Sequence, residues 1–151
     1  LVSTTDGAMI LDEDIPTIGA PRDYHEVSKN MIVESFPQDT PSKTYQPLLD
    51  RIPTWNATVI REALTSMSQF NAHGQLSRIT APTLIIWGER DELLPLQDGY
   101  LLAAAIPGSR LIVYEETGHV VLWEQPERVA TDIADFVAGL STSGQNSTPI
   151  S

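Results

Sequence analysis

The chain has 151 residues, of which 41% are hydrophobic, and this is enough to bury the core of a single domain. Its 20 acidic and 9 basic residues give a formal charge of −11, which repels phosphate backbones, so we expect no nucleic-acid partner. The absence of cysteine excludes disulfides and thiolate chemistry. No run approaches the roughly 18 apolar residues of a membrane span and no signal peptide is visible, so we expect no membrane partner and favour a cytoplasmic location.

The first residues have the pattern of a strand that runs into a turn. An apolar start at Leu1 and Val2 is followed by two hydroxyl residues and then by the turn sequence Thr5-Asp6-Gly7. We therefore expect residues 1–6 to be the end of a core strand.

Residues 7–75 differ in character, because prolines divide them into short pieces. Apolar side chains at helical spacing predict one helix over residues 23–35 and a second over residues 57–70, with Asn56 as the N-cap of the second. The spaced residues are Tyr24, Val27 and Met31 in the first helix, and Ile60, Ala63, Leu64, Met67 and Phe70 in the second. We expect these two helices to be separated by irregular segments.

Two apolar runs further along predict strands joined by a crossover helix. The first run, residues 82–88, continues into a polar turn that ends on Asp91. Pro95 then marks the start of a helix that reaches Ile106, where a Pro-Gly pair stops it. The second apolar run ends in Gly-His, with the histidine at position 119. Because reactive groups collect beyond the carboxyl ends of parallel strands, we expect Asp91 and His119 to meet there.

The pairing of these two residue types has a chemical reason. A histidine can take and return a proton near neutral pH. A buried carboxylate that accepts a bond from Nδ1–H fixes the tautomer and stabilises the imidazolium. His119 follows Asp91 by 28 residues, about the length of one strand-helix-strand crossover. Taken alone, an aspartate after a strand is more often a cap or turn residue, so the pair carries the hypothesis.

The chain closes with a helix and a polar tail. A helix over residues 126–140 places an apolar stripe on one side, which we expect to pack across the sheet. The stripe consists of Val129, Ile133, Phe136, Val137 and Leu140. Residues 141–151 are rich in Ser, Thr, Gly, Asn and Gln, and we expect them to be a disordered tail.

The order of these motifs resembles the C-terminal part of the α/β-hydrolase superfamily, among members with small-molecule substrates and a helical lid. The resemblance rests on Pro-Thr, an apolar run, Gly-x-x-Asp, a crossover, a second apolar run, Gly-His and a helix that opens at Pro126. It implies an α/β fold with a remnant of three parallel strands, flanking helices and a lid. Residues 7–75 would be the lid and residues 76–140 the C-terminal part of the core.

The resemblance also implies the roles of a Ser-His-Asp triad. His119 would be the general base and Asp91 the acid that orients it, while the Gly-x-Ser-x-Gly elbow that carries the nucleophile is not found in this chain. The implied reaction is hydrolysis of a small-molecule ester or lactone. One alternative is an aspartate-nucleophile dehalogenase or epoxide hydrolase of the same fold. Another is a fragment or ligand-binding module without catalysis.

A partner follows from the same resemblance. The chain corresponds to the C-terminal half of such a protein, so the strand at residues 1–4 would present an unpaired edge. Exposed edges recruit partners. We therefore expect this edge to bind the N-terminal half of the same protein or a second copy of the chain.

Apolar side chains of the expected lid are the best candidates to line a substrate pocket, because small-molecule sites are mostly apolar. As a group these are Met31, Trp55, Met67 and Phe70, although core packing between lid helices is the better explanation for any one of them taken singly. Trp123, four residues after His119, is a further candidate, and packing against the last helix is the alternative for it.

The remaining titratable residues do not indicate a further site. His25 and His73 have no metal-ligand spacing with His119, so we expect no metal and no cofactor. Asp6 follows the first strand, where some related enzymes place the acid, although the Thr-Asp-Gly turn accounts for it as well.

Overall fold

A computed structural model describes residues 23–70, 72 and 74–143 of the chain. Helices dominate the first half, and strands alternate with helices in the second. In chain order the elements are α1 (Tyr24–Glu34), η1 (Ser42–Thr44), α2 (Gln46–Leu49), η2 (Ile52–Thr54), α3 (Ala57–Gln69), η3 (Leu76–Arg78), β1 (Leu84–Gly88), α4 (Leu96–Ala105), β2 (Arg110–Tyr114), α5 (Val121–Glu124) and α6 (Pro126–Ser143). The strand expected at residues 1–6, with its pairing edge, and residue His73 lie outside the described residues.

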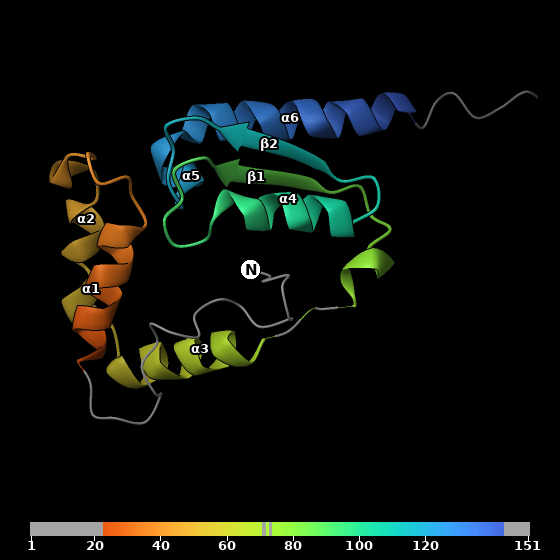
Figure 1. Cartoon of the computed structure of the whole chain (residues 1–151). Helices are drawn as coiled ribbons and strands as arrows, with labels where there is room; N and C mark the ends of the chain where they lie inside the picture. The colour runs from red at the N-terminus through yellow and green to blue at the C-terminus, as the bar shows by residue number, and fades with distance from the viewer. Residues whose placement is uncertain (1–22, 71, 73, 144–151) are drawn as a thin grey trace, which may run out of the picture.

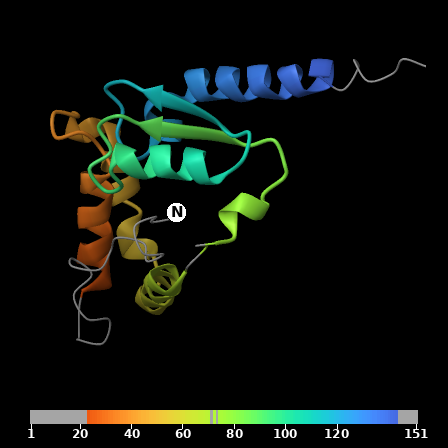
Figure 2. The same ribbon diagram turned by 45° about the vertical axis from the view of Figure 1, so that its right-hand side comes forward.

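The sheet in the described part consists of β1 and β2, which run parallel, with Leu84 opposite Arg110 and Gly88 opposite Tyr114. α4 connects the strands and covers one face of the pair, while α6 covers the other (Figure 1; Figure 2). The two apolar strands and their crossover helix are therefore confirmed. Where three strands were expected, two are described, because the third falls at residues 1–6.

Both expected helices of the first half are confirmed to within one residue, and each begins at a polar cap. The Asp23 carboxylate accepts hydrogen bonds from the backbone N–H groups of His25 and Glu26, at 3.0 and 3.3 Å. The Asn56 side chain does the same at the start of α3. These caps satisfy backbone donors that a helix leaves unpaired at its N-terminus.

The last helix departs from the expectation in two ways. α6 continues to Ser143, so residues 141–143, assigned above to the tail, are helical. Only part of its apolar stripe is covered: Val129 is 3% exposed, whereas Ile133 and Val137 are 45% and 54% exposed. The reason is geometric, because a helix of this length spans about 27 Å and two strands lie only about 4.8 Å apart. α6 does pack on β1, as predicted, but the outer part of its apolar stripe stays exposed in the described residues.

The helices α1 and α2 lie beyond the carboxyl ends of β1 and β2 (Figure 1; Figure 2). Together with η1, η2 and α3 they form what we call the helical region, residues 24–69. Its interior holds Phe36 and Ile52, 2% and 4% exposed, and the Phe36 ring lies 5.3 Å from that of Tyr45. The segment that follows α1 is thus buried where the helical region meets the end of the sheet.

Two glycines allow the loop after β2 to touch the end of β1. A Cβ on Gly88 would lie 2.0 Å from the carbonyl oxygen of Gly118. A Cβ on Gly118 would lie 2.7 Å from the carbonyl oxygen of Ser35 and 2.8 Å from Cδ of Pro37. Since these neighbours are mainly backbone atoms, neither position has room for a side chain.

We predict that Gly118→Ala lowers the free energy of unfolding by about 1–3 kcal/mol, because the methyl group overpacks against backbone. Urea unfolding followed by far-UV circular dichroism measures it. The matched control is Gly139→Ala in α6, where an added Cβ meets nothing within 4 Å. That control should be neutral or gain up to about 1 kcal/mol of stability from helix propensity. Equal stability of Gly118→Ala and the wild type would contradict the packing described above.

Tyr114, the last residue of β2, connects the sheet to α6. Its side chain is fully buried, and its hydroxyl donates to Oδ2 of Asp132 at 2.5 Å. The guanidinium of Arg128 lies 3.8 Å from the ring centroid, within the range of a cation–π contact. Burial, followed by the bond to Asp132, raises the pKa of Tyr114 from 10.0 to about 12.

This shift predicts a loss of stability at alkaline pH. The neutral phenol is favoured in the folded state, so its contribution is complete below pH 10 and is lost as the pH rises towards 12. Between these values the free energy of unfolding should fall by about 1.4 kcal/mol per pH unit more steeply than in Tyr114→Phe. Chemical unfolding across this range measures the slopes, with Tyr100→Phe, at a half-exposed tyrosine, as the control. Parallel slopes for wild type and Tyr114→Phe would refute the assignment.

Candidate active site

Asp91 lies in the turn after β1, and its side chain stabilises this turn. Its side chain is buried, and Oδ1 accepts hydrogen bonds from the backbone N–H groups of Leu93 and Leu94, at 3.0 and 2.9 Å. The N–H of Arg90, one residue earlier, donates to the carbonyl of Thr117 in the loop after β2. The turn is therefore tied to the neighbouring loop, and Oδ2 of Asp91 is left for another partner.

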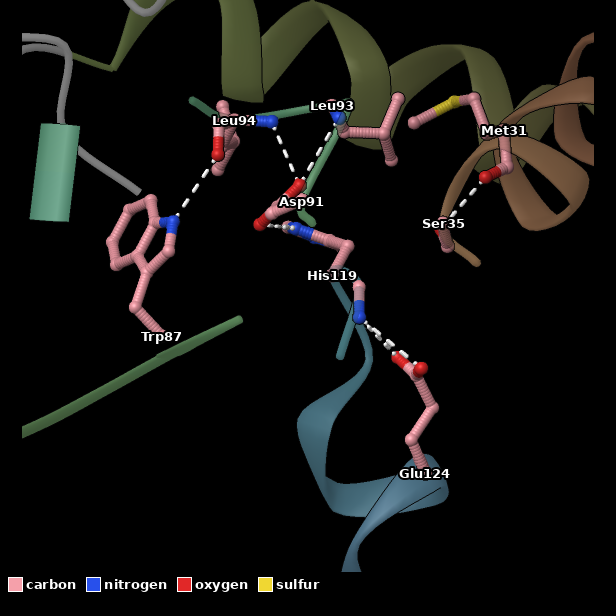
Figure 3. Close-up of polar contacts among 9 residues, drawn as sticks. Met31, Ser35, Trp87, Asp91, Leu93, Leu94, His119 and Glu124 are labelled. Carbon is pink, nitrogen blue, oxygen red and sulfur yellow. Dashed lines mark hydrogen bonds and ion pairs between the residues drawn. The ribbon is translucent and has the colours of Figure 1, made fainter. Parts of the chain in front are cut away.

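His119 supplies that partner. Its Nδ1 lies 2.9 Å from Oδ2 of Asp91 (Figure 3). Because an ionised carboxylate only accepts hydrogen bonds, this contact assigns the ring proton to Nδ1 and leaves the lone pair on Nε2. The Asp91 side chain is 4% exposed and that of His119 26%, so the carboxylate is covered while the ring keeps an accessible edge. Asp91 and His119 are thus in contact, as expected from the sequence.

This arrangement defines what the pair can do chemically. Nε2 makes no hydrogen bond with any of the described residues, so it is available to take a proton from a nucleophile or a water. The Asp91 carboxylate then faces the imidazolium that forms and stabilises it. The described residues contain no cluster of three or more His, Asp or Glu side chains that could hold a metal ion.

The helical region reaches the site through its backbone. The N–H of His119 donates to the carbonyl of Ser35, just after α1, at 2.8 Å. Nε1 of Trp123 donates to the carbonyl of Thr44 at 2.9 Å, so α5 is also joined to the helical region. These contacts come from segments far apart in the sequence, and no sequence pattern signalled them.

Arg90 forms ion pairs with the helical region and with the loop before His119. Its guanidinium lies 2.8 Å from Asp39 of the helical region and 2.9 Å from Glu116 of the loop before His119. The bond to Arg90 lowers the pKa of Asp39, and the bond to Asp39 raises the pKa of Arg90. Both carboxylates are largely exposed, so solvent screens these pairs and their contribution to stability is small. They link the turn after β1 to Asp39 and to the loop before His119.

An open groove of about 610 Å³ lies between α1 and α3. Its lining residues are Ser28, Met31, Ile32, Ser35, Trp55, Asn56, Val59, Ile60, Ala63 and Leu64. The groove adjoins the candidate active site, because Ser35 lines it and also binds the backbone of His119. In Figure 3 the Met31 side chain extends from α1 towards Leu93, next to the Asp91–His119 pair.

Of the five apolar residues proposed for substrate contact, the structure brings two into this groove, Met31 and Trp55. Met67 and Phe70 are not among the lining residues, because the groove ends one turn earlier along α3. Trp123 is turned towards Thr44 and is 45% exposed, so it does not form a wall of the groove either.

Two further titratable groups, Asp98 and His25, lie in environments that the structure defines. Asp98, in the first turn of α4, is 5% exposed, and its Oδ2 has no partner among the described residues. Burial raises the pKa of Asp98, and the charge of Asp91 adds to this. His25 has a structural role, because its Nε2 lies 2.8 Å from the carbonyl of Trp55 and joins α1 to the segment after η2.

Comparison with known proteins identifies the fold family of the chain. The family described as alpha/beta hydrolase fold matches residues 22–126. Monoacylglycerol lipase ABHD6 from Bos taurus is 31% identical over 135 residues, which cover 87% of this chain and 40% of that protein. A Bacillus subtilis protein named uncharacterized hydrolase YugF is 43% identical over 63 residues, covering 42% of this chain and 23% of its own length.

The same fold is found in a solved structure. An esterase from Exiguobacterium antarcticum superposes with a TM-score of 0.68 at 22% identity, over 77% of this chain and 43% of the esterase. Since the family match takes in more than half of the chain, the chain belongs to the α/β-hydrolase fold family. It spans 40% of the length of the bovine relative.

The two functions of Asp91 can be separated by substitution. Asp91→Ala removes the acceptor of two backbone N–H groups and should lower the free energy of unfolding by about 1–3 kcal/mol. Asp91→Asn keeps an oxygen for those donors and should stay within about 1 kcal/mol of the wild type. Urea unfolding of the chain measures both, with the exposed neighbour Glu92→Ala as the control. An alanine variant as stable as the asparagine variant would show that the turn does not depend on this side chain.

Proposed function

We propose that this chain supplies the general base, His119, and its orienting acid, Asp91, to a hydrolase that cleaves small-molecule esters or lactones. The observation that carries the proposal is the 2.9 Å contact between Nδ1 of His119 and the buried carboxylate of Asp91. In the reaction, Nε2 of His119 removes the proton of a serine that attacks the acyl carbon, and then gives this proton to the departing alcohol. A water that loses its proton to the same Nε2 then attacks the acyl-serine, and the acid leaves as the proton passes back to the serine oxygen.

The serine would lie outside the 151 residues. The chain spans 40% of the length of the bovine monoacylglycerol lipase, so most of such a protein remains to provide a nucleophile and an oxyanion hole. The name of this relative favours an ester substrate over the halides and epoxides considered above. The proposed partner of this chain is therefore the remainder of its own protein.

The apolar groove suits the less polar part of such a substrate. Small-molecule sites are concave and mostly apolar, with few polar groups. The groove between α1 and α3 has these properties, and it lies next to the loop that carries His119. We propose that the helical region covers the site as a lid, with Met31 and Trp55 in contact with the acyl or alcohol group.

The catalytic assignment predicts the effect of two substitutions in the protein expressed from its complete coding sequence. His119→Ala and Asp91→Asn should each lower kcat for a short aryl ester by about 10³-fold or more, the second because asparagine favours the wrong ring tautomer. Initial rates measure this, with Glu127→Gln, at an exposed glutamate of α6, as the control. Near wild-type rates for His119→Ala would end the assignment.

The nucleophile is tested separately by mass spectrometry after treatment with a phosphonate ester that modifies active-site serines. A single adduct that requires His119 is the expected result. An unmodified protein that hydrolyses a haloalkane or an epoxide would assign the chain to the aspartate-nucleophile alternative. An unmodified protein without turnover of any of the three substrates would favour the non-catalytic alternative.

A further inference from the structure

The backbone around His119 is held from two opposite sides. The N–H of His119 donates to the carbonyl of Ser35 in the helical region. The N–H of Gly118 donates to the carboxylate of Glu124, 3.0 Å from Oε1 and 3.1 Å from Oε2 (Figure 3). The residue before His119 is therefore held by the Glu124 side chain, and His119 itself by the helical region.

Glu124 lies in an unusual place for a glutamate. It belongs to α5, a helix of one turn, in which Leu122 and Trp123 are 68% and 45% exposed while Glu124 is turned inward. Burial raises its pKa, the charge of Asp91 raises it further, and the hydrogen bond from the N–H of Gly118 lowers it. Burying a carboxylate costs free energy unless hydrogen bonds compensate for the lost water. Here both oxygens of Glu124 accept from a backbone N–H group and not from another side chain.

The position of Gly118 matters because it precedes the histidine directly. A Cβ on Gly118 would lie 3.2 Å from Oε1 of Glu124, so the carboxylate packs against this residue as well as binding its N–H. A shift of the peptide at Gly118 moves the Cα of His119 and changes where Nε2 points. Misplacement of a reacting group by about 1 Å can lower a rate by about 100-fold.

We propose that Glu124 is a positioning residue, whose carboxylate fixes the peptide before His119 and thereby aligns the ring with Asp91 and with the nucleophile. The role depends on an oxygen acceptor at this distance from α5. It does not depend on the negative charge. This inference rests on the proposed function, since it concerns the placement of the proposed general base.

The test uses ester hydrolysis by the protein expressed from its complete coding sequence. Glu124→Gln keeps an acceptor at the same reach, and its kcat should stay within about 3-fold of the wild type. Glu124→Met removes the acceptor at similar length, and Glu124→Asp keeps the charge but shortens the reach. Both should lower kcat by about 10–100-fold, with KM within about 3-fold. Glu127→Met, at an exposed glutamate in the first turn of α6, is the matched control.

Three results would overturn the proposal: a wild-type kcat in Glu124→Asp or Glu124→Met, a loss confined to KM, or an equal loss in Glu124→Gln. If thermal unfolding shows that Glu124→Met does not fold, the comparison of Glu124→Asp with Glu124→Gln decides.

A second readout does not require turnover. The Nδ1 proton of His119, observed by NMR in the same proteins, should be retained in Glu124→Gln and lost in Glu124→Asp and Glu124→Met. If the wild type hydrolyses no ester, the proposed function fails, and this resonance alone decides the role of Glu124. Its retention in the aspartate and methionine variants would refute that role.

Discussion

The contact between the backbones at Gly88 and Gly118 is the constraint on which the candidate active site depends. Parallel strands bring their carboxyl ends to one edge, but the loops that follow them diverge unless something draws them together. Here the end of β1 and the loop after β2 touch directly, with no room for a Cβ at either glycine. Asp91 and His119 follow these glycines closely in sequence. Their separation is therefore set mainly by backbone packing.

Around this contact the loops are held by hydrogen bonds other than the one between Asp91 and His119. Arg90 donates its N–H to Thr117, and Asp91 builds its own turn with the oxygen that His119 does not use. One carboxylate thus shapes the loop and orients the ring, so a change at Asp91 affects both structure and chemistry. The turn after β1 is in this way fixed by hydrogen bonds next to His119. The loop that carries His119 is held in turn by Glu124 of α5 and by the carbonyl of Ser35.

The helical region is connected to the site through these same contacts. Movement of α1 would pull on the carbonyl of Ser35, on the Arg90–Asp39 pair and on the N–H of His119. The groove between α1 and α3 is lined by residues on either side of this connection. The groove and the histidine backbone thus share one residue, Ser35. The described part of the chain contains no helix that could span a membrane and no cluster of side chains that could hold a metal ion.

The sequence alone predicted what depends on local pattern. The two strands, the crossover helix, the cap at Asn56 and the pairing of Asp91 with His119 all follow from periodicity, turn residues and the order of motifs. It did not predict what depends on packing between distant segments. The inward turn of Glu124, the contact of Ser35 with His119 and the exposure of Ile133 and Val137 are set by neighbours far away in the chain, which single-sequence patterns do not encode.

The most direct test of the central claim is a crystal structure of the protein expressed from its complete coding sequence, after reaction with a phosphonate ester. The account predicts a phosphonate bound to a serine outside the present 151 residues, with the serine oxygen about 3 Å from Nε2 of His119. The Nδ1 contact with Asp91 should remain. A phosphonate on another residue, or an imidazole whose Nε2 faces away from it, would contradict the account.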